Sequence, residues 1–421
     1  MTRKLLSILL ICLTAVGGLT AQRSYSETVL QRSGHEVSFR GAWIATVANI
    51  DWPSVEAVGN TERQQAEMIW ELDSLAAIGI NAIVFQVRPT SDALYLSELE
   101  PVSHWLTGRQ GEWGGQERWD PLAWTIRQAH ARNMEVHVWL NPYRVNLAKT
   151  DTSSLAPSHI FRKHPDWFWH YAGQWYFDPG LDATREWICS VVQDIVMRYD
   201  IQAIHMDDYF YPYPSGGQPL PDTPTFKKHP RGFDNIEDWR RNNVNMVIRE
   251  IHRTILECNP DVEFGISPFG VWRNAAVDST GSATTAGITN YDNLYADIRL
   301  WIQKGWIDYV LPQLYWEIGK KAADYRILAH WWANEVRGTD CKLYIGLAPY
   351  RLENASPKSA WGQGNEIGRQ LRLNRTIPEI SGECFYSTRP LLRNPRHVCD
   401  TIKAFYKDDD AQKAPDFLPW E

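Results

Sequence analysis

The segment TERQQAEMIWELDSLAAIGINAIVFQVR, from Thr61 to Arg88, contains the structural unit on which the architecture of this 421-residue chain depends. Its first half predicts an amphipathic helix, because Thr61-Glu-Arg-Gln64 matches a capping box and Gly79 is a typical helix stop. Between them, apolar side chains recur at helical spacing, at Met68, Ile69, Leu72, Leu75 and Ala76. The second half, Ala82–Arg88, is a short β-rich run that predicts a strand.

The same unit of helix and strand recurs along the chain. A helix is expected to begin with Asp120 as its N-cap and Pro121 in its first turn. Further helices are expected at 182–199, 234–257, 292–304, 322–336, 365–373 and 395–406. Strands are expected at Phe39–Val47, Ala82–Arg88, Glu135–Asn141, Ala203–Asp207, Glu263–Pro268, Tyr309–Tyr315, Leu343–Ala348 and Glu383–Ser387. Eight strands alternating with helices predict an α/β fold, a single-domain (β/α)₈ TIM barrel.

Loop lengths indicate which end of the barrel carries the function. Connections from a helix to the next strand are short, whereas the connections after four strands are long, at 89–119, 142–181, 209–232 and 269–289. Long loops at the carboxyl ends of barrel strands are typical of the face that holds the active site.

The ends of the chain predict export and a small tail. Met1-Thr-Arg-Lys4, the apolar run Leu5–Leu19 and Thr20-Ala21 have the pattern of a signal peptide over 1–21, cleaved after Ala21. A lead-in at 22–38, a barrel at 39–406 and a tail at 407–421, packed back through Phe417, Leu418 and Trp420, are expected to follow. We therefore expect a periplasmic or secreted protein without stable membrane insertion. Lipid anchoring at Cys12 is less favoured, because Leu9-Leu-Ile11 lacks the small residue of a lipobox.

Composition excludes several other classes of protein. A net charge of −7 argues against a nucleic-acid partner, which normally meets a basic face. The five cysteines after the signal peptide are scattered and contain no C-x-x-C pair, so neither a zinc site nor a cofactor is expected. The 21 Trp and 18 Tyr residues provide many flat amphipathic rings, which suit stacking against sugar faces as well as core packing.

Strand alternation selects the candidate catalytic side chains. In Ala203-Ile-His-Met-Asp207, Ile204 and Met206 suit the apolar outside, so His205 and Asp207 are predicted to face the barrel interior, with Asp208 at its lip. Glycoside cleavage requires two carboxyl groups, one as an acid and one as a nucleophile or base. We interpret Asp207, or its neighbour Asp208, and Glu317 as this pair. Structural alternatives remain: Asp208 could cap a loop, and Glu317 could favour a helix dipole.

Two alternatives from other classes remain open. His137, His205, Asp207 and Asp208 could ligate a metal in a barrel hydrolase or deacetylase, although the His-x-Asp spacing has no strong zinc signature. A barrel that binds a glycan without cleaving it is the second alternative, and a complete carboxyl pair would distinguish a hydrolase from it.

Several segments together resemble a known family. They are Phe39–Thr46, Gln86-Val-Arg-Pro89, Asn141-Pro-Tyr-Arg144, Ile204–Pro212, Gly265–Arg273 and Leu311–Trp316. In this order and at these strand ends, between about Phe39 and Ser387, they resemble glycoside-hydrolase-like family ten of the bacterial envelope. The resemblance implies a TIM barrel that acts on peptidoglycan glycan strands, especially strands without peptides. Many retaining barrel glycosidases have a Glu after strand seven, but Ile345–Arg351 contains none, which leaves the second carboxyl open.

The remaining polar and aromatic residues of these loops suit substrate contact. Arginine, asparagine and tyrosine side chains can bind hydroxyl, acetamido and carboxylate groups, and aromatic rings can stack on sugars. The substrate-binding candidates are Arg88, Asn141, Tyr143, Arg144, His205, Tyr209, Tyr211, Gln313, Tyr315 and Trp316. The expected function is that of a secreted glycoside hydrolase acting on β-linked amino-sugar chains.

Overall fold

The computed structural model describes residues 38–147, 151–363 and 365–413. The predicted signal peptide, nearly all of the lead-in, and Phe417, Leu418 and Trp420 of the tail lie outside these residues. Contacts divide the chain into two units, Phe39–Phe405 and a second unit of Met1–Ser38 with Tyr406–Glu421. The first unit contains every strand of the described residues, and the candidate site lies within it.

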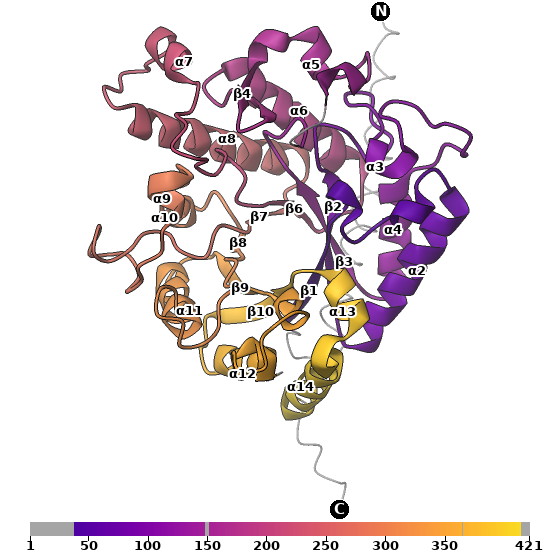
Figure 1. Ribbon diagram of the computed structural model, residues 1–421, viewed down its shortest axis with the longest axis vertical. Helices are drawn as coiled ribbons and strands as arrows, with labels where there is room; N and C mark the ends of the chain where they lie inside the picture. Colours follow the sequence, from indigo (N-terminus) through magenta and orange to yellow (C-terminus); the bar gives the residue numbers. More distant parts are fainter. Residues whose placement is uncertain (1–37, 148–150, 364, 414–421) are drawn as a thin grey trace, which may run out of the picture. The chain divides into compact units, whose positions relative to one another are not determined.

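Eight parallel strands close into a barrel, which confirms the predicted fold (Figure 1). Their order around the barrel is β1-β10-β9-β8-β7-β6-β3-β2. The strands are β1 (Phe39–Ile44), β2 (Ala82–Arg88), β3 (Glu135–Leu140), β6 (Ala203–Met206), β7 (Glu263–Ile266), β8 (Tyr309–Val310), β9 (Lys342–Leu347) and β10 (Ile380–Phe385). β8 is much shorter than expected, since Pro312 has no N–H to continue the ladder. Beyond β8, two isolated bridges join Gln313 to Phe269 and to Gly346.

Helices surround the strands on the outside (Figure 1). The longer ones are α2 (Thr61–Ala77), α4 (Pro121–His130), α6 (Asp182–Arg198), α8 (Ile236–Cys258), α11 (Tyr325–Val336), α12 (Glu366–Asn374) and α14 (Val398–Lys413). The short ones are α3 (His104–Thr107), α5 (Ile160–Lys163), α7 (Thr223–Lys228), α9 (Asn290–Asn293), α10 (Ile298–Gln303) and α13 (Thr388–Arg393).

Helix starts follow the expected chemistry with two differences. Asp120 caps α4 as predicted, accepting a hydrogen bond from the backbone N of Ala123. The cap of α2 is Asn60 rather than Thr61, since the Asn60 side chain accepts from the backbone N of Arg63. The single helix expected at 292–304 is two helices, α9 and α10, because the Asp297 side chain caps a new start by accepting from the backbone N of Leu300.

A small β-hairpin in the loop between β3 and α6 was not predicted. Its strands β4 (Phe168–Tyr171) and β5 (Gln174–Phe177) pair antiparallel around the turn Ala172-Gly173. Both turn residues have positive φ, +49° and +82°, as a two-residue hairpin turn requires. The sequence signal was present: a glycine-containing dipeptide between two aromatic runs.

The barrel interior is filled with aromatic and imidazole side chains. Tyr309 occupies the space above Gly265, where a Cβ atom would lie 1.8 Å from the tyrosine ring. The Tyr309 hydroxyl lies 2.9 Å from Nδ1 of His137 and 2.8 Å from Nδ1 of His205. This packing closes the lower barrel, so a site can open only at the carboxyl ends of the strands.

Candidate active site

Two consecutive carboxyl groups, Asp207 and Asp208, follow β6 at the carboxyl end of the barrel. Each residue is only 4% exposed. The strand places Ile204 and Met206 in the core between barrel and helices, which sets Asp207 in phase with the interior-facing His205. Burial of two adjacent acids is costly unless the protein or a ligand compensates for it.

A polarised chain of amides fixes Asp207. The Oε1 atom of Gln86 accepts from the backbone N–H groups of Thr46 and Val47, both at 2.9 Å. Its Nε2 therefore donates to Oδ1 of Asn141 at 2.6 Å. The Nδ2 of Asn141 is left to donate to Oδ2 of Asp207, also at 2.6 Å. Strands β1, β2 and β3 together thus deliver a hydrogen-bond donor to this carboxylate.

Hydrogen bonds and a nearby cation favour the ionised form of Asp207. Its Oδ1 accepts from the backbone N of Tyr209 at 3.1 Å, so both of its oxygens receive a hydrogen bond. Burial raises the pKa of Asp207, while the charge of Arg144 and these hydrogen bonds oppose that rise. Donors aimed at both oxygens stabilise the ionised form.

Asp208 is the member of the pair whose environment favours the protonated form more strongly. Burial and the negative charge of Asp207 raise the pKa of Asp208 to about 7. Its Oδ2 accepts from the Tyr213 hydroxyl and its Oδ1 accepts from Nε2 of Gln313 at 3.3 Å, and both hydrogen bonds oppose that rise. Two carboxyls whose environments separate their pKa values have the character of an acid and its anionic partner.

Arg144 and Tyr209 form one side of the site. The Arg144 guanidinium lies over the Tyr209 ring, 4.4 Å from its centroid. Tyr209 is 40% exposed, the most open aromatic ring beside the carboxyl pair. Both residues therefore lie beside the site, where Arg144 provides a cation and Tyr209 an accessible ring.

A group of aromatic rings lies beside the carboxyl pair, and we call Trp43, Tyr315, Tyr350 and Tyr386 the aromatic cluster. Tyr386 lies 5.9 Å from Trp43, 6.0 Å from Tyr315 and 6.2 Å from Tyr350, between ring centroids. Burial is the main cause of the raised pKa of Tyr386 and of Tyr315, and Asp207 and Asp208 respectively are among the smaller contributions. Of these, the sequence analysis named only Tyr315 as a substrate-binding candidate; Tyr350 lies in a turn after β9, and Tyr386 follows β10.

Glu317 does not join the pair among the described residues. Its Oε2 accepts from Nε1 of Trp361 at 2.9 Å, and Lys320 lies 3.4 Å from its Oε1. Despite some desolvation, backbone, Trp361 and Lys320 interactions lower the pKa of Glu317. These polar partners suit an ionised carboxyl rather than a proton donor, and the expected role of Glu317 as the second carboxyl stays a prediction.

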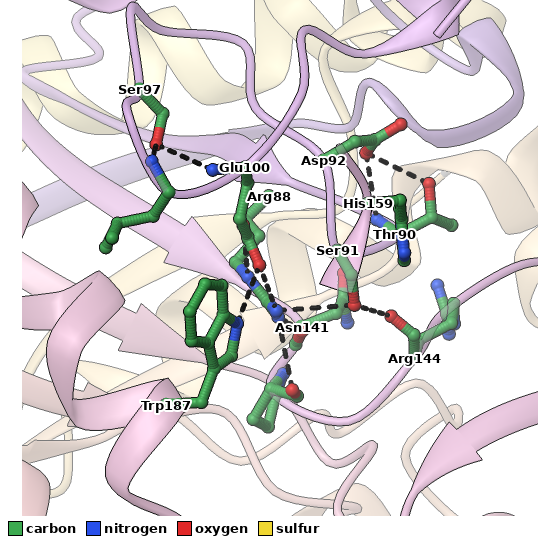
Figure 2. Close-up of polar contacts among 12 residues, drawn as sticks. Arg88, Thr90, Ser91, Asp92, Ser97, Glu100, Asn141, Arg144, His159 and Trp187 are labelled. Atoms are coloured by element: carbon green, nitrogen blue, oxygen red, sulfur yellow. Dashed lines mark hydrogen bonds and ion pairs between the residues drawn. The ribbon is translucent and has the colours of Figure 1, made fainter. Parts of the chain in front are cut away.

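Arg88 serves the protein rather than a substrate (Figure 2). It is 1% exposed and forms a two-point ion pair with Glu100, at 2.6 and 2.8 Å. Its Nη1 donates to the backbone oxygens of Asn141 and Pro142, at 2.6 and 3.1 Å. The predicted substrate contact of Arg88 is thus corrected: the residue holds the β3 loop that carries Asn141.

Three further predicted contact residues are buried away from any substrate. Tyr143 and Tyr211 are fully covered, and Tyr211 accepts from Nδ2 of Asn243 at 3.2 Å. His205 lies inside the barrel, with its two nitrogens on Tyr309 and Ser267. In each case the residue lies near a strand end as predicted, but its side chain packs against a neighbouring helix or within the barrel core.

The other predicted residues have mixed outcomes. Asn141 positions Asp207, and Gln313 links Asp208 to the backbone oxygen of Ser267 at 2.9 Å. Trp316 is partly exposed and packs edge-on against Phe269 at 5.4 Å. The tyrosine that contacts Asp208, Tyr213, was missed, although the tyrosine-rich Tyr209–Tyr213 loop is a visible signal.

The proposed metal group does not assemble in the described part of the chain. His137 and His205 both turn to the Tyr309 hydroxyl. Over residues 38–147, 151–363 and 365–413, no three His, Cys, Asp or Glu side chains are grouped as a metal site would need.

In the same ranges, no helix has the length and apolar character needed to cross a membrane.

A hollow of about 780 Å³ lies between the loops that follow β2 and β3. Its lining includes His104, Arg109, Asn146, Leu155 and Arg162. None of the residues that contact Asp207 or Asp208 lines it, so it is separate from the carboxyl pair.

Comparison with known proteins finds relatives over most of the chain. A family model described as glycosyl hydrolase-like 10 matches residues 38–361. The glycosyl hydrolase YngK of Bacillus subtilis is 47% identical over 86% of this chain and 70% of its own length. The glycosyl hydrolase DigH of Escherichia coli K12 is 41% identical over 82% of each chain.

Solved structures share the fold at low identity. An endo-1,4-beta-mannanase from Rhizomucor miehei has a TM-score of 0.55 and 11% identity, over 90% of this chain and 96% of that chain. Alpha-L-fucosidase isoenzyme 2 from Paenibacillus thiaminolyticus has a TM-score of 0.53 and 13% identity, over 90% of this chain and 50% of that chain. These similarities show the barrel architecture.

Proposed function

Because this chain belongs to the glycosyl hydrolase-like 10 family, we propose that it hydrolyses glycosidic bonds at the Asp207–Asp208 pair. The observation that carries this proposal is the unequal environment of the two carboxyls. Both carboxyls are buried and accept hydrogen bonds on both oxygens, but the Arg144 charge opposes the rise in the pKa of Asp207, whereas burial and the Asp207 charge raise the pKa of Asp208 to about 7. This is the combination of anion and acid that glycoside cleavage requires.

Each carboxyl has a distinct task in the reaction. Asp208, protonated near neutral pH, donates its proton to the leaving oxygen as the glycosidic bond breaks. Asp207 remains ionised and stabilises the positive charge that develops at the anomeric centre. Gln86 and Asn141 position Asp207 through the amide chain, and Gln313 and Tyr213 position Asp208.

The proposed substrate is a β-linked amino-sugar chain, in particular peptidoglycan strands without peptides. The partly exposed rings of Tyr315, Tyr350 and Tyr386, together with Tyr209, offer apolar ring faces for stacking on sugars. Arg144 offers a cation for the lactyl carboxylate of a muramic acid unit, which is free only when the peptide is absent. The family resemblance to bacterial envelope enzymes supports the same substrate.

The proposed location is the periplasm or the exterior, after removal of residues 1–21. The basic start and the apolar run of Leu5–Leu19 support it. Fractionation of cells that express the full chain, followed by N-terminal sequencing, tests it: a mature start at Gln22 is expected, and an uncleaved cytoplasmic protein would contradict it.

The function is tested by product release from defined glycans. We expect new reducing ends from peptide-free peptidoglycan strands, and none from cellulose or starch. Asp208→Asn should abolish release, whereas Asp261→Asn, an exposed residue just before β7, serves as the matched control and should leave it unchanged. Cellulose cleavage at a rate equal to that on glycan strands would contradict the substrate. A parent protein that binds strands without cleaving them would be a binding protein.

A further inference from the structure

The site contains an acid and an anion but shows no separate nucleophile among the described residues. Asp207 and Asp208 are consecutive residues at the end of one strand, so both reach the substrate from the β6 side. Double displacement and direct displacement by water both need carboxyls on opposite sides of the scissile bond, about 5.5 Å apart or about 6.5–9.5 Å apart respectively. A pair from one strand end does not provide that opposition.

The other carboxylates near the strand ends are already bound by the protein. Among the described residues, Asp51 accepts from the Ser387 hydroxyl at 2.7 Å and from two backbone N–H groups at 2.8 Å. The remaining pairs join Asp92 to Gln110, Glu100 to Arg88, Asp222 to Arg240, Asp292 to Arg273 and Glu317 to Trp361. Each of these carboxylates therefore already has a hydrogen-bond or ion-pair partner within the protein.

We propose that the nucleophile is the 2-acetamido group of the substrate, held by Asp207 while Asp208 transfers the proton. This inference rests on the proposed function and names the substrate feature on which that function depends. A neighbouring acetamido group attacks within the same molecule, which gives it a high effective concentration without any side-chain nucleophile. Such substrate assistance is an alternative to double displacement in glycoside hydrolysis.

The position of Asp207 suits an acetamido group. Its carboxylate is rigid, because Asn141 and the Tyr209 backbone hold its two oxygens, and each oxygen has a further lone pair that can accept an amide N–H. The partly exposed rings of Tyr315, Tyr350 and Tyr386 provide an apolar surface beside Asp207 for the acetyl methyl group.

Atoms and charges balance at each step of this reaction. The acetamido oxygen forms a bond to C1 as the bond from C1 to the leaving oxygen breaks. The leaving oxygen takes the proton of Asp208. The resulting cyclic oxazolinium ion keeps its N–H on the Asp207 carboxylate. Water then adds to C1 and returns a proton to Asp208 while the ring opens. The acetamido group is restored, and the β configuration is retained.

N-acyl substitution tests the proposal directly. Peptide-free glycan strands are N-deacetylated and then re-acylated with either acetyl or trifluoroacetyl groups. Fluorine withdraws electrons from the attacking oxygen, so we expect kcat/KM to fall roughly a hundredfold or more on the trifluoroacetyl strands, since the acyl group itself attacks. Re-acetylated strands are the control and should be cleaved like native strands.

Two further measurements separate the possible outcomes. A thiazoline sugar, a stable mimic of the cyclic intermediate, should inhibit the enzyme, and Asp207→Asn should weaken its binding. The proposal would be overturned in favour of a side-chain nucleophile by two results together. The acetyl and trifluoroacetyl strands would be cleaved at equal rates, and mass spectrometry would show a 2-fluoro sugar bound covalently to Asp207. An inverted product by NMR would overturn the proposal in favour of water. Failure to cleave any strand, native ones included, would instead overturn the proposed function.

Discussion

Asp208→Asn is expected to stabilise the fold at neutral and alkaline pH while it removes turnover. In the folded protein, burial and the Asp207 charge raise the pKa of Asp208 from 3.8 to about 7. Between these values the unfolded chain has released the Asp208 proton and the folded protein still holds it, so stability falls as pH rises. Above pH 7 the folded protein must bury the charge, and asparagine avoids that cost.

The size of the effect follows from the pKa shift. A rise of roughly three units, at about 1.4 kcal/mol per unit, gives an upper limit of about 4 kcal/mol. Asp207 is close enough to share the titration, so we expect about 2–4 kcal/mol of relative stabilisation between pH 4 and pH 8. Most of this change should appear between pH 4 and 7.

The assay is denaturant unfolding of the parent and variant at several pH values. The difference in unfolding free energy between Asp208→Asn and the parent should grow with pH and level off above about pH 7. Taking the difference removes the contributions of other buried acids such as Asp51 and Glu71. The exposed Asp261→Asn control should show a flat difference. A flat difference for Asp208→Asn as well would refute the reasoning that Asp208 is a buried acid.

The remaining predictions concern activity and support of the site. Because Asp208 must be protonated to act, kcat/KM should fall with pH above about 7, approaching tenfold per pH unit; a profile that stays level to pH 9 would move the acid elsewhere. Asn141→Leu removes a charge-assisted donor from Asp207, so the acid limb of the rate profile should move up by about one pH unit, and an unmoved limb would contradict the amide chain. Glu317→Gln should change turnover on glycan strands by less than about tenfold, because Glu317 is bound to Trp361 and Lys320; a loss of several orders of magnitude would restore it as the acid. Arg88→Leu leaves Glu100 buried without its cation and should lower the unfolding free energy by about 3–5 kcal/mol, whereas an unchanged midpoint would show that the ion pair is dispensable.

Much of the fold could be predicted because periodicity reports burial directly. The bounds of β2, Ala82–Arg88, were predicted to the residue. The strand predicted at Ala203–Asp207 is β6, which ends one residue earlier, at Met206. Prediction failed where one residue changed the backbone. Pro312 shortens β8, and the Ala172-Gly173 turn adds a hairpin within a loop.

The site could be predicted only in part, because a strand end shows which residues reach a face but not what lies above them. Asp207 and Asp208 follow from alternation alone. Tyr143 and Tyr211 occupy similar strand-end motifs, but the structure buries both. Tyr386 enters the site from the end of β10 through tertiary packing, which no local pattern of the sequence encodes, whereas Tyr213 lies in the tyrosine-rich loop after β6 and could have been included.

The central claim is that Asp207 and Asp208 together cleave a glycan strand. The most direct measurement compares reducing-end release from peptide-free peptidoglycan strands by the parent, Asp207→Asn and Asp208→Asn, with strand binding measured in parallel. We predict release by the parent, and binding with turnover reduced by orders of magnitude in both variants, since asparagine preserves shape but removes the charge or the proton. Undiminished release by either variant, or a parent that binds strands and never cleaves them, would contradict the claim.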